Sequence, residues 1–205
     1  MSELELDDVV VVLRLHDPED AYVASSALIE GGVGSVEITM TVPSATEVIA
    51  RLRPTGARLG AGTVLDPATV AEVVDAGASF IVAPDTREGV IAAARAADVP
   101  MIPGALTPSE ISRALLLGAA AVKVFPVDAV GGPDYIASLR GPLPDAPLVV
   151  SGGVAVEQAR RYLRLGVRSV CMGREFLDAD EVAARDARAI TARARRVLDT
   201  VAARN

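Results

Sequence analysis

The sequence has very few of the side chains that bind metals or act as nucleophiles. Its 205 residues include one cysteine, one histidine and no tryptophan. Cys171 and His16 are too few for a structural zinc site, which takes about four nitrogen or sulfur ligands, so we expect no metal. A Ser-His-Asp triad would have to use His16, and the sequence has no G-x-S-x-G elbow. One cysteine permits no internal disulfide, which fits a reducing compartment, and we therefore expect a cytoplasmic protein.

Charge and hydropathy exclude further classes of protein. The sequence has 20 Lys and Arg residues and 27 Asp and Glu residues, which gives a net charge of −7. Nucleic-acid binding needs a basic face, so we expect no nucleic-acid partner. The segment from Met1 to Asp8 is acidic, unlike a signal peptide. Its apolar runs are shorter than the ~18 residues of a membrane span, so we expect no membrane contact.

The chain repeats a unit of strand, turn and amphipathic helix. Glycines follow several of the predicted helices, and Pro or a capping residue precedes many of them, as in Asp66-Pro67 and Thr107-Pro108. This alternation predicts a (β/α)₈ TIM barrel in a single domain over residues 1–205, closed by one helix over about 178–203. An open doubly wound sheet is the alternative, but no G-x-G-x-x-G follows the first strand. The predicted strands end roughly 22 residues apart, near Leu15, Met40, Gly62, Ala83, Pro103, Phe125, Ser151 and Met172.

Lysine is almost absent, which draws attention to the one that remains. Nineteen of the 20 basic residues are arginine, and Lys123 lies in the apolar stretch 119–125. An unpaired buried charge is costly, so Lys123 is either paired or used as a neutral amine. A neutral amine can attack a ketone and form a Schiff base. A structural salt bridge with Glu37 is the alternative, and we favour the functional amine because lysine occurs nowhere else.

Glu37 alternates with apolar residues in the predicted strand 35–41. Both faces of a barrel strand are normally covered, so the polar set of Glu37 and Thr39 is expected to face the barrel centre. A carboxylate there can move protons between substrate oxygen and carbon, or it can simply neutralise Lys123. We expect Thr39, and Phe125 on the face of Lys123, to contact the substrate.

Arg14 interrupts the first predicted strand, which is otherwise apolar up to His16. Its guanidinium can bind a carboxylate at two points, or it can cap a helix or pair with Glu37. We interpret it as a ligand-binding residue and His16 as a loop residue. The turn at Gly62 and Thr63 allows close approach of the backbone and offers a hydroxyl, which alone is a weak signal.

Two glycine turns follow the last two predicted strands. The loop after the seventh strand is Ser151-Gly152-Gly153, and the eighth strand ends at Gly173-Arg174. These loops are the usual phosphate position in this fold, because backbone N–H groups at a helix N-terminus bind anions. Arg174 can add a charge-assisted contact. We interpret Cys171 as a small core residue.

Five segments together resemble the 2-keto-3-deoxy-6-phosphogluconate (KDPG) and 4-hydroxy-2-oxoglutarate aldolases, which are class I enzymes. The segments are GGVGSVEITM (31–40), LGAGTVL (59–65), IPGALTPSE (102–110), VKVFP (122–126) and SGGV (151–154). The resemblance implies a (β/α)₈ barrel, a homotrimer, and neither metal nor organic cofactor. It implies a Schiff-base lysine at Lys123, a proton-shuttling glutamate at Glu37, a pyruvyl-carboxylate contact at Gly62 and Thr63, and a phosphate loop at Gly152 and Gly153.

Three positions depart from the family pattern. Thr41 stands where many members have an arginine that binds the carboxylate, and Arg14 is our candidate replacement, as in the related phosphogalactonate aldolases. Gly173-Arg174 replaces a common Gly-Ser pair, and residues 83–85 read Ala-Pro-Asp instead of Ser-Pro-Gly. The last two departures affect the part of the site that would hold the distal half of a substrate.

The resemblance leads us to expect cleavage of KDPG to pyruvate and glyceraldehyde 3-phosphate. The alternative substrates are 2-keto-3-deoxy-6-phosphogalactonate and 4-hydroxy-2-oxoglutarate. A non-catalytic phosphate-ligand binder or scaffold is the alternative of another class, and the Lys123–Glu37 pair argues against it.

Overall fold

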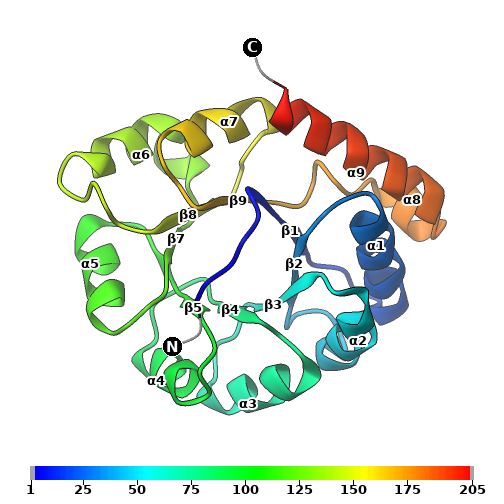
Figure 1. The fold of residues 1–205 in the computed structure, drawn as a ribbon, viewed down its shortest axis with the longest axis horizontal. Helices are drawn as coiled ribbons and strands as arrows, with labels where there is room; N and C mark the ends of the chain where they lie inside the picture. Colours follow the sequence, from blue (N-terminus) through cyan, green and yellow to red (C-terminus); the bar gives the residue numbers. More distant parts are fainter. Residues whose placement is uncertain (1–2, 204–205) are drawn as a thin grey trace.

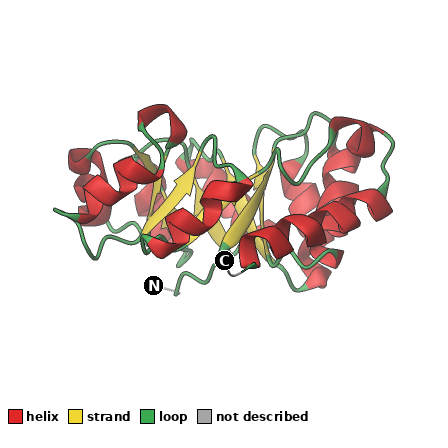
Figure 2. Ribbon diagram, turned by 90° about the horizontal axis from the view of Figure 1, so that it is seen from above, coloured by secondary structure: helices red, strands yellow, loops and turns green. Residues whose placement is uncertain are grey.

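The computed structural model describes residues 3–203, in which parallel strands alternate with helices. Figure 1 shows the strands as an inner ring and the helices as an outer ring, and Figure 2 shows the tilted strands flanked by helices. The predicted (β/α)₈ barrel is therefore confirmed. The strands are β1 (Val9–Leu13), β2 (Ser35–Thr39), β3 (Arg58–Gly62), β4 (Phe80–Val82), β5 (Met101–Ile102), β6 (Gly104–Ala105), β7 (Val122–Val124), β8 (Leu148–Ser151) and β9 (Ser169–Met172).

Several helices begin where proline and capping residues predict them. Asp17 and Asp66 accept hydrogen bonds from the first backbone N–H groups of their helices, and Thr107 forms a capping box with Glu110. Short 3₁₀ turns occupy Arg53–Thr55 and Asp128–Val130. The helices are α1 (Pro18–Glu30), α2 (Ala45–Leu52), α3 (Pro67–Ala76), α4 (Glu88–Ala96), α5 (Pro108–Leu116), α6 (Pro133–Arg140), α7 (Val156–Arg164), α8 (Ala179–Ala183) and α9 (Ala187–Ala202).

The fifth predicted strand closes the barrel in two pieces. The sheet order is β5-β4-β3-β2-β1-β9-β8-β7-β6, so β5 pairs with β4 and β6 pairs with β7. Pro103 separates β5 from β6, and it has no N–H to donate to a neighbouring strand. Its carbonyl accepts a hydrogen bond from the Lys123 amide at 2.8 Å. Because β5 and β6 are consecutive in the chain, this bend joins the two edges of the sheet into a ring.

The C-terminal segment corrects one prediction. In place of a single helix over about 178–203, the structure has α8 and α9, separated by Arg185 in the left-handed region at φ 53°. Asp178 caps α8 and Asp186 caps α9 through the Ala189 amide at 3.0 Å. An aspartate that bonds nearby backbone N–H groups favours a helix start over a helix interior, which is the physical reason for the break.

The barrel interior is filled by an apolar group that we call the interior cluster. Its residues alternate along the strands with those that face the helices, as the period of two requires. Leu4 and Leu6 pack against it from the N-terminal segment, which crosses the ring opening in Figure 1. The segment therefore covers the amino-terminal end of the barrel. The interior cluster consists of Val10, Phe80, Val82, Ile102, Ala121, Val149 and Cys171.

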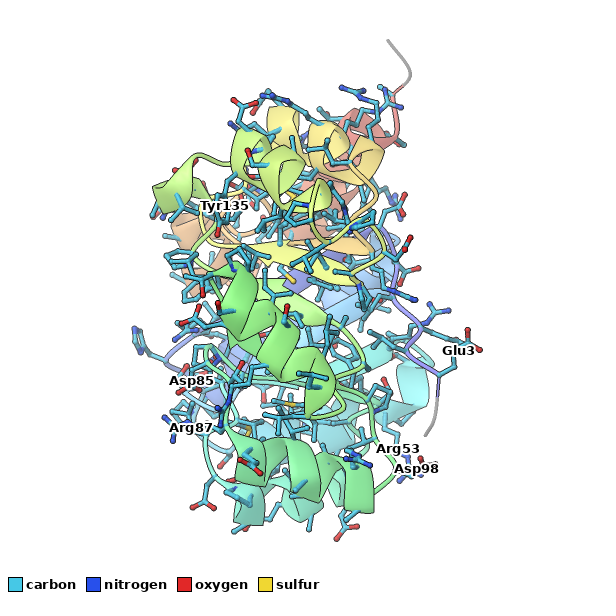
Figure 3. The ribbon with its side chains drawn as sticks, turned by 90° about the vertical axis from the view of Figure 1, so that its left-hand side faces the viewer. Glu3, Arg53, Asp85, Arg87, Asp98 and Tyr135 are labelled. Carbon is cyan, nitrogen blue, oxygen red and sulfur yellow. The ribbon has the colours of Figure 1, made fainter. Side chains whose placement is uncertain are left out.

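The two ends of the barrel are distinct in Figure 3. Asp85, Arg87 and Tyr135 lie on the side opposite Glu3 of the N-terminal segment. Asp85 and Arg87 follow β4, so theirs is the end at which the strands terminate. Active sites of this fold lie at that end.

Among residues 3–203, none of the helices has the length and apolar character of a membrane span.

Candidate active site

Lys123 and Glu37 meet inside the barrel. Lys123 is 7% exposed on β7 and Glu37 is 1% exposed on β2, and their Nζ and Oε1 atoms are 4.0 Å apart. Val122 and Val124 face the helices, so the alternation along β7 turns the lysine inward. The structure thus brings together the two residues that the sequence predicted as catalytic.

The Glu37 carboxylate has space only because Gly62 has no side chain. A Cβ atom at Gly62 would lie 2.0 Å from Oε1 and 2.6 Å from Cδ of Glu37. The other oxygen, Oε2, is buried and has no hydrogen-bond partner within residues 3–203. A buried oxygen without a partner is costly, and a ligand that brings a hydroxyl or water would satisfy it.

Phe125 covers the amine. The Lys123 Nζ lies 5.5 Å from the centre of the Phe125 ring, within cation–π range. This contact agrees with the prediction that the Phe125 and Lys123 side chains lie on the same face.

Arg14 lies at the mouth of the barrel, just after β1. Its Nη2 donates a hydrogen bond to Thr63 Oγ1 at 3.3 Å. Thr63 has a φ of 58°, in the left-handed region that is unusual for a β-branched residue. Such backbone strain concentrates at ligand sites, and here it places a hydroxyl beside a guanidinium.

Thr39 is buried next to Glu37 along β2, but its hydroxyl is already engaged. It donates to the Leu13 carbonyl at 3.0 Å and lies 2.8 Å from the Thr41 hydroxyl. Thr41 is exposed and carries no charge at the position of the missing arginine. His16, another polar residue after β1, is exposed in a bend that leads to α1, as predicted for a loop residue.

A cavity of about 340 Å³ opens beside this group, between the ends of β8 and β9. Gly152 and Gly153 have φ values of 90° and 83°, and Ala155 gives α7 no side-chain cap. Uncapped N–H groups beside glycines form an anion-binding surface. The predicted binding residues at these strand ends share this cavity, which is lined by Val12, Ser151, Gly152, Gly153, Val154, Ala155, Cys171, Met172, Gly173, Arg174 and Glu175.

Cys171 belongs both to the interior cluster, as predicted for a core residue, and to the lining of the cavity. Burial, followed by the charge of Glu37, raises the pKa of its thiol to about 12, and Lys123 acts in the opposite direction. The thiol is therefore neutral at physiological pH, and the charges of Glu37 and Lys123 both act on a residue that lines the cavity. Cys171 was predicted as a core residue alone, and Glu175 was not predicted as a site residue. The signal in the sequence was their place at or just after the end of β9.

Comparison with known proteins places the chain in a family. The family described as KDPG and KHG aldolase matches residues 1–193. The KHG/KDPG aldolase of Escherichia coli (strain K12) is 35% identical over 202 residues, covering 97% of this chain and 94% of the relative. This chain belongs to the KDPG and KHG aldolase family.

Solved structures of aldolases share the fold of this family member. The KDPG aldolase of Legionella pneumophila, with pyruvate captured as a covalent carbinolamine, superimposes with a TM-score of 0.84, at 28% identity and 93% coverage of each chain. A native KDPGal structure superimposes with a TM-score of 0.83, at 29% identity, covering 99% of this chain and 100% of the other.

Another departure from the family pattern lies at the mouth of this aldolase, after β4. Asp85 pairs with Arg87 at 3.0 Å, and Arg87 also bonds the Leu65 carbonyl. Residues 83–85 therefore connect to the loop after β3. Gly104 makes this packing possible, because a Cβ there would lie 2.0 Å from the Pro84 carbonyl oxygen.

The space at Gly62 generates a prediction. In Gly62→Ala the new methyl group must displace the Glu37 carboxylate, and we expect the aldol cleavage rate to fall roughly 10²-fold. Overpacking should also lower the free energy of unfolding by about 1–3 kcal/mol. Steady-state kinetics and denaturant unfolding measure the two effects. Gly141→Ala is the matched control, since its Cβ would approach nothing closer than 3.5 Å. A Gly62→Ala enzyme with wild-type kcat would show that the position of Glu37 is unimportant.

Proposed function

We propose that this protein is a class I aldolase that cleaves 2-keto-3-deoxy-6-phosphogluconate to pyruvate and glyceraldehyde 3-phosphate through a Schiff base on Lys123. The observation that carries the proposal is the buried amine 4.0 Å from a buried carboxylate at the carboxyl ends of the strands. The relative from Legionella pneumophila, which holds pyruvate as a covalent carbinolamine, supports the same chemistry.

The amine of Lys123 attacks the C2 ketone, and loss of water gives an iminium. Glu37, directly or through a water molecule, takes the proton of the C4 hydroxyl. The electrons of the C3–C4 bond move into the iminium, which becomes an enamine as the aldehyde leaves. Glu37 then returns the proton to C3, and hydrolysis releases pyruvate and the free amine. The iminium is the electron sink, so the reaction needs no cofactor.

The remaining predicted residues would position the substrate. Arg14 and Thr63 form a donor pair at the barrel mouth that suits the pyruvyl carboxylate. Ser151, Gly152, Gly153, Gly173 and Arg174 would bind the distal phosphate in the cavity beside them.

Phosphogalactonate or 4-hydroxy-2-oxoglutarate cleavage is the second candidate function. The uncharged Thr41 and the Arg14–Thr63 contact favour it, because the related phosphogalactonate aldolases share the arginine of the first strand. A panel of the three substrates distinguishes these activities. A non-catalytic phosphate-ligand binder would have no use for the Lys123–Glu37 pair.

We also propose a homotrimer in the cytoplasm. The family resemblance suggests the trimer, and Leu116 on α5, 88% exposed, offers an apolar contact for another subunit. The single cysteine, Cys171, is consistent with a reducing compartment.

Trapping with pyruvate and borohydride tests the proposed function. Borohydride reduces the iminium to a stable amine, and we expect one three-carbon unit per chain, on Lys123. Intact mass and peptide mapping locate it, and the N-terminal amine serves as an internal control because Lys123 is the chain's one lysine.

The control variant for trapping must keep its fold. Lys123→Met alone leaves Glu37 buried without a partner, which costs about 3–5 kcal/mol. The double variant Lys123→Met/Glu37→Gln removes both charges and should fold without forming the adduct. Labelling confined to the N-terminal amine, with full cleavage activity in the double variant, would refute the Schiff base on Lys123.

Arg14 generates a separate prediction. Arg14→Ala should weaken every 2-keto acid, including pyruvate, by roughly 1.5–3 kcal/mol, the scale of a hydrogen bond to a charged group. The concentration dependence of pyruvate trapping measures this loss. Arg14→Lys keeps the charge but loses the two-point geometry, so it should recover part of the affinity. If Arg14→Ala traps pyruvate at wild-type concentrations, Arg14 is a structural residue.

A further inference from the structure

Two opposite charges stand next to each other on the wall of the cavity between β8 and β9. Arg174 and Glu175 both line it, together with Gly152 and Gly153. Arg174 is exposed and Glu175 is half-buried. Within residues 3–203 neither side chain forms a hydrogen bond or an ion pair, with each other or with another residue. Both are therefore available to a bound molecule.

The backbone of this cavity attracts anions. Gly152 and Gly153 lead into α7, whose first turn has no side-chain cap. The exposed N–H groups and the positive end of the helix dipole favour a negative group, and Arg174 adds a full positive charge.

Two carboxylates oppose this attraction. Glu175 lines the cavity, and Asp128, which does not line it, packs against Gly153 of the glycine loop. A Cβ on Gly153 would lie 2.5 Å from the Asp128 Cβ and 3.1 Å from its Oδ2. A phosphate monoester carries about two negative charges near neutral pH, so both carboxylates repel it. A sugar hydroxyl, in contrast, can donate to a carboxylate and accept from a guanidinium.

We propose that Glu175 is a specificity-determining residue that lowers this enzyme's preference for a phosphate and admits unphosphorylated 2-keto-3-deoxy sugar acids. The inference rests on the proposed aldolase function and names the substrate class of the same site. The distal hydroxyls of such a substrate would donate to Glu175 and accept from Arg174. Arg174 and Glu175 thus have opposite effects on phosphate selectivity.

The test is the ratio of kcat/KM for KDPG to kcat/KM for the same acid without its phosphate. Glu175→Gln keeps the shape and removes the charge, and we expect the ratio to rise about tenfold as a repulsion near the phosphate is lost. Glu175→Ser should also raise the ratio, and it replaces Glu175→Gln in the test if that variant folds poorly. Arg174→Ala should lower it.

Glu157→Gln is the matched control. Glu157 is exposed on the first turn of α7 and does not line the cavity. Its loss changes the net charge equally and should leave the ratio unchanged. An unchanged ratio in both Glu175 variants would overturn the proposal. An equal rise in Glu157→Gln would also overturn it, because the effect would then come from the overall charge.

Pyruvate trapping on the wild-type enzyme separates this inference from the proposed function. An adduct on Lys123 together with an unchanged ratio refutes the role of Glu175 alone. Absence of the adduct, with no cleavage of either substrate, refutes the aldolase function and this inference together.

Discussion

The active site depends on one buried pair of ionisable side chains, Lys123 and Glu37. Their Nζ and Oε1 atoms lie 4.0 Å apart, beside the apolar interior cluster. Taking two charges out of water costs several kcal/mol each, and each is tolerated because the other is present. The same pairing holds the amine next to a group that can take and return a proton. Loss of one partner alone is therefore destabilising, and the same contact serves the chemistry.

The backbone around the pair is shaped to leave room for it. Gly62 makes space for the Glu37 carboxylate, and Gly60 does the same for the Phe80 ring, which a Cβ would approach to 2.2 Å. Leu6 and its neighbours in the N-terminal segment pack under the interior cluster and cover the far end of the barrel. A ligand consequently meets the pair from the side of Arg14 and the cavity.

Much of this arrangement follows from local pattern. Alternation along β2 and β7 was enough to turn Glu37 and Lys123 inward, because a strand has a period of two whatever its surroundings. The break in the fifth strand at Pro103, the two helices in place of one around Arg185, and the engagement of the Thr39 hydroxyl by Leu13 were not predicted. Each depends on contacts between residues distant in sequence or on a competition between capping and helix extension.

The distal half of the site was the least predictable part. The glycine loop signals an anion, but the sequence does not say which neighbouring side chains share the cavity. The structure adds Glu175 and Cys171 to the lining of the cavity beside Arg174. Selectivity between phosphorylated and unphosphorylated substrates depends on the sum of several charges around this cavity. That sum can be assessed only when the residues that line the cavity are known.

The most direct test of this account compares two reactions of pyruvate in Glu37→Gln. Borohydride trapping reports attack by Lys123, and deuterium exchange into the pyruvate methyl group reports proton transfer by Glu37. The account predicts that the variant still forms the adduct while its exchange rate falls by about 10²–10⁴-fold, the contribution of a general acid–base group. Exchange at the wild-type rate would contradict it, because another group would then move the proton.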